Sequence, residues 1–325
     1  MSTLEDGRRR IRRRGRRGEQ PMVPDVEFTS YYGRPILKPS PWAEDIPAYL
    51  FFGGLAGGSA LLGAGADLTD RPVLRRRARL TALGAIGVSL VALVHDLGRP
   101  ARFLNMLRVA KPTSPMSIGT WILSAFGPFV GLAAAAEFPR LAPRPLRGLL
   151  RRAGRPAGLT AAVIAPAVAS YTAVLLSDTA TPTWHESYRE LPFVFVGSAS
   201  MASGGMGMLV APVDEAGPAR RMAVGGALLD LAAIQKMESS AGIAAETLHK
   251  GRAGVLMRLG KSLTAAGLLG TALGGRDRRV AAAAGLALLG GSACGRFGVF
   301  YAGQESAADP KYTVVPQRER VAGRS

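Results

Sequence analysis

Cysteine is almost absent from this chain of 325 residues, in which Cys294 is the only one. An iron–sulfur cluster usually needs four thiolates, so the chain cannot bind one alone, and it cannot form an internal disulfide. Cys294 lies in an apolar stretch near the C-terminus, where we expect a small packing residue. Redox centres built from several cysteines are therefore excluded.

Histidine is scarce as well, with only His95, His185 and His249. None of the three lies in the middle of an apolar stretch, which excludes the usual haem anchor of paired histidines in facing membrane helices. Their wide separation matches no local zinc or di-iron motif. We therefore expect no haem and no bound metal, so any electrons that the protein handles must come from a partner.

Acidic residues are in deficit, since 23 Asp and Glu stand against 41 Lys and Arg, for a formal net charge of +18. Arginines are concentrated in the run from Arg8 to Arg17, RRRIRRRGRR. We expect residues 1–45 to form a mostly disordered basic tail and a segment that leads into the first helix. Contact with anionic lipid is the alternative role of the run. Nucleic-acid binding is not expected, because no basic face recurs on a structured element.

The N-terminal region has no recognisable cleavable signal peptide. Such a peptide places an apolar segment after its basic residues, and none follows the arginine run here. Membrane insertion would then rely on the first apolar stretch. The true start of the chain could be Met1 or Met22.

Charge and apolar residues alternate in long blocks, and this pattern predicts an all-α integral membrane protein. A helix of about 20 uncharged residues crosses the bilayer core, and residues 46–66 carry no charge. The sequence predicts eight transmembrane helices, at residues 46–66, 79–96, 117–136, 157–177, 192–212, 222–238, 254–274 and 280–302. The sixth is the weakest, because Asp230, Lys236 and Glu238 interrupt it.

Loop charge predicts the orientation. With eight crossings, both termini and the loops 97–116, 178–191 and 239–253 lie on one side. The loops on the other side carry more than twice as many arginines and lysines. The positive-inside rule makes that second side cytoplasmic, so both termini are expected outside the cytoplasm. The arginine run disagrees, but it lies far from the first predicted crossing.

Two features suggest how the helices are organised. The first and fifth crossings begin alike, with Asp45-Ile46-Pro47 and Glu190-Leu191-Pro192, which indicates either parallel repeats or chance. Glycines four residues apart, as in the pairs Gly53/Gly57 and Gly54/Gly58, predict faces that neighbouring helices approach closely.

Two uncommon strings identify a family resemblance. They are YYGRPILKPSPWAEDIPAYLFFGGLAGGSALL (residues 31–62) and the hairpin DLGRPARFLNMLRVAKPTSPMSIGTW (residues 96–121). Together they resemble the NrfD/PsrC family, the membrane subunits of molybdopterin oxidoreductases such as polysulfide reductase. The resemblance implies two side-by-side four-helix bundles, at residues 46–177 and 178–302, and a C-terminal tail at residues 303–325. It also implies electron exchange between an iron–sulfur partner and the membrane quinone pool.

The resemblance places a quinone pocket at the start of the first crossing, beside the iron–sulfur subunit. The candidate residues for quinone binding and proton exchange share this membrane depth: Glu44, Asp45, Tyr49, His95, Asp96, Ser117 and Trp121. Tyr49 could donate to a quinone carbonyl, and Asp45 or His95 could exchange protons. A histidine that some relatives use within the first crossing is missing here.

Structural roles compete with each of these assignments. Tyr49 and Trp121 could be aromatic residues of the membrane interface. Asp96 could form a helix-end ion pair with Arg99. The acids Glu44 and Asp45 could have a purely structural role, in which their negative charge stabilises the helix dipole at the start of the first crossing.

Two further sets of charges are functional candidates. The hairpin carries four cations and no acid after Asp96, which suggests a docking surface for an acidic partner: Arg99, Arg102, Arg108 and Lys111. Asp230, within a predicted crossing, could relay protons or could pair with Arg296. The end-of-crossing acids Asp67 and Glu137 are expected at the membrane interface.

The sequence thus predicts a multi-pass protein of the plasma (inner) membrane that is not catalytic alone. Its exchangeable cofactor would be menaquinone or ubiquinone. Its partners would be a four-cluster ferredoxin-like iron–sulfur subunit and, through it, a molybdopterin catalytic subunit. The rival functions are a secondary transporter and a purely structural membrane anchor. The polar hairpin argues against a transporter, which would place its polar groups at the bilayer midplane.

Overall fold

The computed structural model describes residues 36–38, 40–274 and 276–322. Their regular structure is entirely helical, and this part of the chain contains no strand. The expectations for the arginine run, for Met1 and Met22 and for most of the N-terminal tail fall outside the described residues.

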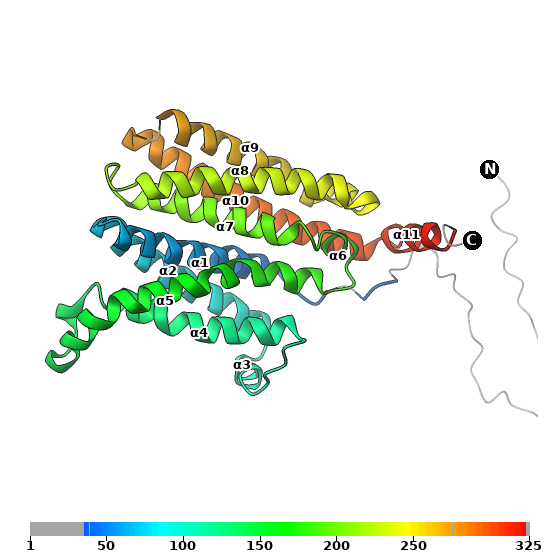
Figure 1. Ribbon diagram of the computed structural model, residues 1–325. Coiled ribbons are helices and arrows are strands. Elements are labelled where there is room, and N and C mark those ends of the chain that lie inside the picture. Colours follow the sequence, from blue (N-terminus) through cyan, green and yellow to red (C-terminus); the bar gives the residue numbers. More distant parts are fainter. Residues whose placement is uncertain (1–35, 39, 275, 323–325) are drawn as a thin grey trace, which may run out of the picture. The chain divides into compact units, whose positions relative to one another are not determined.

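Eight of the helices in the described residues are 20 residues or longer (Figure 1). They are α1 (Asp45–Leu68), α2 (Pro72–Asp96), α4 (Pro115–Ala135), α5 (Arg144–Ser177), α7 (Leu191–Val210), α8 (Gly217–Ser240), α9 (Gly251–Gly274) and α10 (Arg278–Ala308). Shorter helices lie between them or after them: η1 (Pro100–Arg102), α3 (Phe103–Met106), η2 (Pro139–Leu141), α6 (Pro182–Glu186), η3 (Gly242–Leu248) and α11 (Lys311–Ala322). Each predicted crossing corresponds to one of the eight long helices.

Six helices of the described chain are long and apolar enough to cross a membrane: α1, α2, α4, α5, α7 and α10. The chain is therefore a multi-pass membrane protein. Helices α8 and α9 are long enough but carry more charge, and part of that charge is paired between them. Lys261 of α9 donates to both carboxylate oxygens of Glu238 on α8, at 2.6 and 2.7 Å. Whether these two helices also cross remains a prediction.

Three helices extend well beyond the predicted crossings, and the first of them, α2, begins at Pro72, where the prediction began at residue 79. Helix α5 begins at Arg144, where the prediction began at residue 157, because arginine is a good helix former and does not end a helix where the apolar block ends. Helix α10 continues to Ala308, so the predicted C-terminal tail at residues 303–325 is wrong in its first residues. Gly303 is buried against the ring of Trp184, and α11 follows.

Helix α1 is packed against α2, α5, α7 and α10, and its glycines allow the close contacts. A Cβ atom at Gly57 would lie 3.0 Å from the backbone oxygen of Ala165 on α5. One at Gly58 would lie 2.8 Å from the backbone oxygen of Ala199 on α7. The prediction that these glycines admit neighbouring backbones is confirmed at Gly57 and Gly58, whereas Gly53 and Gly54 face side-chain atoms. Without a hydrophobic drive between helices in lipid, such packing is a main source of association.

Replacing Gly58 by alanine should therefore destabilise the fold, because the added methyl group overlaps α7. Overpacking of this kind costs about 1–3 kcal/mol. Thermal unfolding of the variant in detergent should show a lower midpoint than that of the wild type. Gly65→Ala is the matched control in the same helix, because its Cβ atom would meet nothing within 4 Å. Equal midpoints for the two variants would contradict the close packing of α1 on α7.

Candidate functional site

The start of α1 is held by the end of α2. The backbone N–H of Ala43 donates to Oδ1 of Asp96 at 3.2 Å, across 53 residues of sequence. The alternative of an ion pair between Asp96 and Arg99 is wrong, since the described ion pairs do not include it and Asp96 binds this backbone amide instead. Gly98 ends α2 with a φ of 65°, a left-handed conformation that glycine adopts without steric cost.

Asp45 and His95 are brought together at this edge, as two of the predicted proton-exchange residues. The Nδ1 atom of His95 lies 2.8 Å from Oδ2 of Asp45, which joins the first turn of α1 to the last turn of α2. The His95 side chain is 78% exposed and that of Asp45 33%. The pair can therefore exchange protons with the surroundings while Asp45 fixes the orientation of the imidazole.

Tyr49 lies four residues after Asp45, so both are on one face of α1. It is only 2% exposed and is part of the buried apolar cluster, so the alternative of an interfacial aromatic residue is wrong for it. No hydrogen bond of its hydroxyl occurs among the described residues. Tyr171 of α5 resembles it in this respect. It is buried against Gly119 of α4, its hydroxyl has no partner, and the sequence had not singled it out.

Glu44 binds the second half of the chain. Its Oε1 atom accepts a hydrogen bond from the Tyr301 hydroxyl at 2.8 Å and one from Arg252 at 3.0 Å. These two donors hold the pKa of the Glu44 carboxyl below its usual value, so Glu44 stays ionised at neutral pH. The Arg252 guanidinium also lies over the Tyr301 ring, 4.1 Å from its centroid. Glu44 therefore ties α1 to α9 and α10.

Further contacts at this edge could not be anticipated from the sequence. Gln304 donates to the backbone oxygen of Trp42 at 2.9 Å, across 262 residues. The ring of Trp42 lies 5.8 Å from that of Trp184, which is fully buried and donates to the Val299 carbonyl at 2.8 Å. The only sequence signal was Trp184 itself, a tryptophan in the predicted loop 178–191.

Ser117 and Trp121 shape the hairpin. Both side chains donate to the backbone oxygen of Val109, at 2.8 Å from Ser117 Oγ and 3.1 Å from Trp121 Nε1. The backbone N–H of Lys111 donates in turn to Ser117 Oγ at 3.0 Å. No contact between described residues joins these two side chains to Asp45 or His95. They hold the segment after α3 against the start of α4.

All four hairpin cations are exposed, as expected for a docking surface. Arg102 donates to the backbone oxygen of Leu97 at 3.3 Å, which fixes its stem at the end of α2. Within the described part of the chain, none of the four has an acidic partner. This surface is therefore uncompensated positive charge directly beside the Asp45–His95 pair.

Asp230 and Arg296 are both buried, at 3% and 2% exposure. The Arg296 guanidinium donates to the Phe195 carbonyl at 2.6 Å and to Ser198 Oγ at 3.2 Å, and it lies over the Phe195 ring. Asp230 is near enough for its charge to act on Arg296, but no ion pair joins the two in the described chain. Arg296 is thus held mainly by α7.

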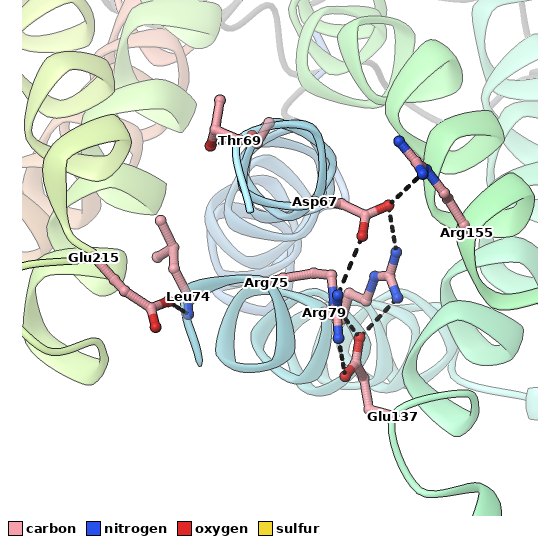
Figure 2. Close-up of polar contacts among 9 residues, drawn as sticks. Asp67, Thr69, Leu74, Arg75, Arg79, Glu137, Arg155 and Glu215 are labelled. Atoms are coloured by element: carbon pink, nitrogen blue, oxygen red, sulfur yellow. Dashed lines mark hydrogen bonds and ion pairs between the residues drawn. The ribbon is translucent and has the colours of Figure 1, made fainter. Parts of the chain in front are cut away.

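The opposite end of α1 and α2 carries a buried ion-pair network, which Figure 2 shows. Glu137, at the end of α4, binds Arg79 at 2.7 Å and Arg75 at 2.9 Å. Asp67 is 3.3 Å from Arg75, 3.6 Å from Arg79 and 3.5 Å from Arg155 of α5. The Glu137 side chain is 6% exposed and that of Asp67 10%. The network joins α1, α2, α4 and α5.

Replacing Glu137 by glutamine should lower the midpoint of thermal unfolding in detergent. The change leaves Arg75 and Arg79 with Asp67 alone, and removing one partner of a buried ion pair costs about 3–5 kcal/mol. Asp70→Asn removes the same charge from an exposed turn and should change stability by less than about 0.5 kcal/mol. Similar midpoints for both variants would show that the network does not stabilise the fold.

Comparison with known proteins places these features in a family. A model of the family described as "Polysulphide reductase, NrfD" matches residues 37–242, from just before α1 to just after α8. The match includes the Asp45–His95 pair, the hairpin, the ion-pair network and Asp230, and it ends before α9 and α10. A search of curated proteins finds no match. Within the described residues, no group of three or more His, Cys, Asp or Glu side chains could hold a metal ion.

Proposed function

The chain belongs to the NrfD family, whose members are membrane subunits of polysulphide reductase-like oxidoreductases, and we propose that it exchanges electrons with the quinone pool of the plasma membrane. In this proposal a peripheral iron–sulfur subunit of the ferredoxin type, with a molybdopterin subunit behind it, supplies or receives the electrons. The likeness to polysulphide reductase favours a role in anaerobic respiration.

The observation that carries the proposal is the pairing of Asp45 with His95, on the same face of α1 as Tyr49 and one helical turn before it. Reduction of menaquinone or ubiquinone takes two electrons and two protons and yields the quinol. Tyr49 would donate a hydrogen bond to a quinone carbonyl, since its hydroxyl has no hydrogen-bond partner among the described residues. His95 would pass protons from the exposed surface, with Asp45 holding the imidazole in place.

Electrons would arrive at the same edge. The chain has one cysteine, so the electron donor must be another subunit. The hairpin starts at Asp96, directly after His95, and its four cations have no acidic partner among the described residues. An acidic iron–sulfur subunit docked there would lie beside the proposed quinone site, which keeps the electron transfer distance short.

Removing the proposed donors should slow quinone turnover without loosening the complex. We expect Tyr49→Phe and Asp45→Asn each to lower quinone reduction about 10-fold or more, as for a lost proton donor. Tyr188→Phe, which changes an exposed tyrosine outside the proposed site, should leave turnover unchanged. Full turnover in both site variants would move the quinone site away from the start of α1.

Charge reversal in the hairpin should instead weaken the binding of the partner subunit. Arg102→Glu with Arg108→Glu should reduce co-purification of the iron–sulfur subunit, most strongly at low salt, because charge complementarity steers docking. Arg276→Glu with Arg279→Glu, in the α9–α10 loop and the first turn of α10, is a charge-matched control that should retain the subunit. Unchanged co-purification of the hairpin variant would place the partner on another surface.

The proposed orientation has eight crossings, with both termini outside the cytoplasm. Reporter domains fused in loops 67–78 and 138–156 should then be active only as cytoplasmic reporters, because those loops are arginine-rich. A reporter after α11 should be active only outside the cytoplasm. A cytoplasmic signal from that C-terminal fusion would reverse the orientation and move the proposed quinone site to the other face.

A further inference from the structure

Helix α5 is longer than a membrane crossing requires. Its 34 residues span about 51 Å at 1.5 Å per residue, against a hydrocarbon core of about 30 Å. Its apolar block begins after Pro156, so the turns from Arg144 to Arg155 extend beyond the core, and η2 precedes them. The segment 139–155 therefore lies at the level of the lipid headgroups or beyond.

This segment has more positive charge than the fold uses. Asp67 and Glu137 are taken up by Arg75, Arg79 and Arg155, as Figure 2 shows. Four exposed arginines of this segment have no hydrogen bond or ion pair through their side chains within the described part of the chain: Arg140, Arg144, Arg151 and Arg152. We call these four the basic face. No acid among the described residues balances their charge.

Exposed leucines are interspersed with these arginines. Leu141 is 84% exposed, Leu146 48% and Leu149 60%. Within α5, Leu146 and Leu149 are three residues apart and share one side of the helix. Arg144 and Arg151 lie on the opposite side of α5, and leucines on one side with arginines on the other are the pattern of a helix at the membrane interface, with its leucines toward the acyl-chain boundary and its charges at the headgroups. Leucines exposed to this degree argue against an occupant that is only a soluble anion or an acidic protein.

We propose that the basic face binds the phosphate of anionic phospholipids in the adjacent leaflet, with Leu141, Leu146 and Leu149 inserted beside the acyl chains. A guanidinium can donate two hydrogen bonds to one phosphate, which suits arginine better than lysine to this task. The lipid would supply the negative charge that Asp67 and Glu137 cannot, and would anchor α5 at its N-terminal end. This site is separate from the proposed quinone edge at the other end of α1.

The test uses the full chain in zwitterionic detergent with added phosphatidylglycerol, and native mass spectrometry to count the lipids retained. Replacement of Arg144, Arg151 and Arg152 by glutamine should weaken phosphatidylglycerol binding about 100-fold, since each of the three charges near an anionic surface contributes about 1 kcal/mol. The unfolding midpoint without added lipid should stay unchanged, because these side chains have no partner within the described fold.

Three further arms decide between outcomes. Glutamine at Arg99, Arg102 and Arg108 removes the same charge from the hairpin and should retain most of the lipid. Leu146→Ser with Leu149→Ser should weaken phosphatidylglycerol binding, although all arginines remain. Glycerol phosphate, the headgroup without acyl chains, should not compete at equal concentration. Wild-type binding by the α5 variant, equal loss in the hairpin variant, or full competition by glycerol phosphate would each overturn the proposal.

Discussion

A charge placed in or near a low-dielectric layer has to be paired, and the rest of this structure depends on that constraint. Asp67 and Glu137 end their helices next to arginines of α2 and α5, so that four helices are joined at one end. Glu238 and Lys261 do the same between α8 and α9. These pairs neutralise charges that interrupt the apolar surfaces of the helices.

The two ends of the bundle use charge in different ways. At the α1 start, Glu44 is paired with Arg252 and Asp45 with His95, while the hairpin cations are left without acids. At the opposite end Asp67 and Glu137 are paired with arginines, whereas the arginines of the basic face have no acidic partner among the described residues. Unpaired charge of one sign at both ends fits two kinds of external partner, a protein subunit at one end and lipid at the other.

Small residues set how closely the helices can approach once the charges are paired. Gly57 and Gly58 present adjacent sides of α1 to α5 and α7, and Ser203 of α7 donates to the Leu55 carbonyl at 3.1 Å. The start of α1 is in turn fixed by Asp96 and Glu44. The proposed quinone site therefore lies at the start of α1, a helix that contacts both halves of the chain.

The sequence alone determined the class of protein, the number of long helices and the close packing of the glycine faces. These features depend on the length of each apolar block and on the size of neighbouring residues, which can be read along the chain. The sequence also identified the family, and it placed Asp45 and His95 at one depth. Only the tertiary structure decided that Tyr49 faces the interior, that Asp96 binds a backbone amide and that Glu44 meets Arg252 across 208 residues. Depth along a helix can be counted from a sequence, but rotation about its axis and its choice of neighbours depend on contacts between distant segments, which leave no local pattern.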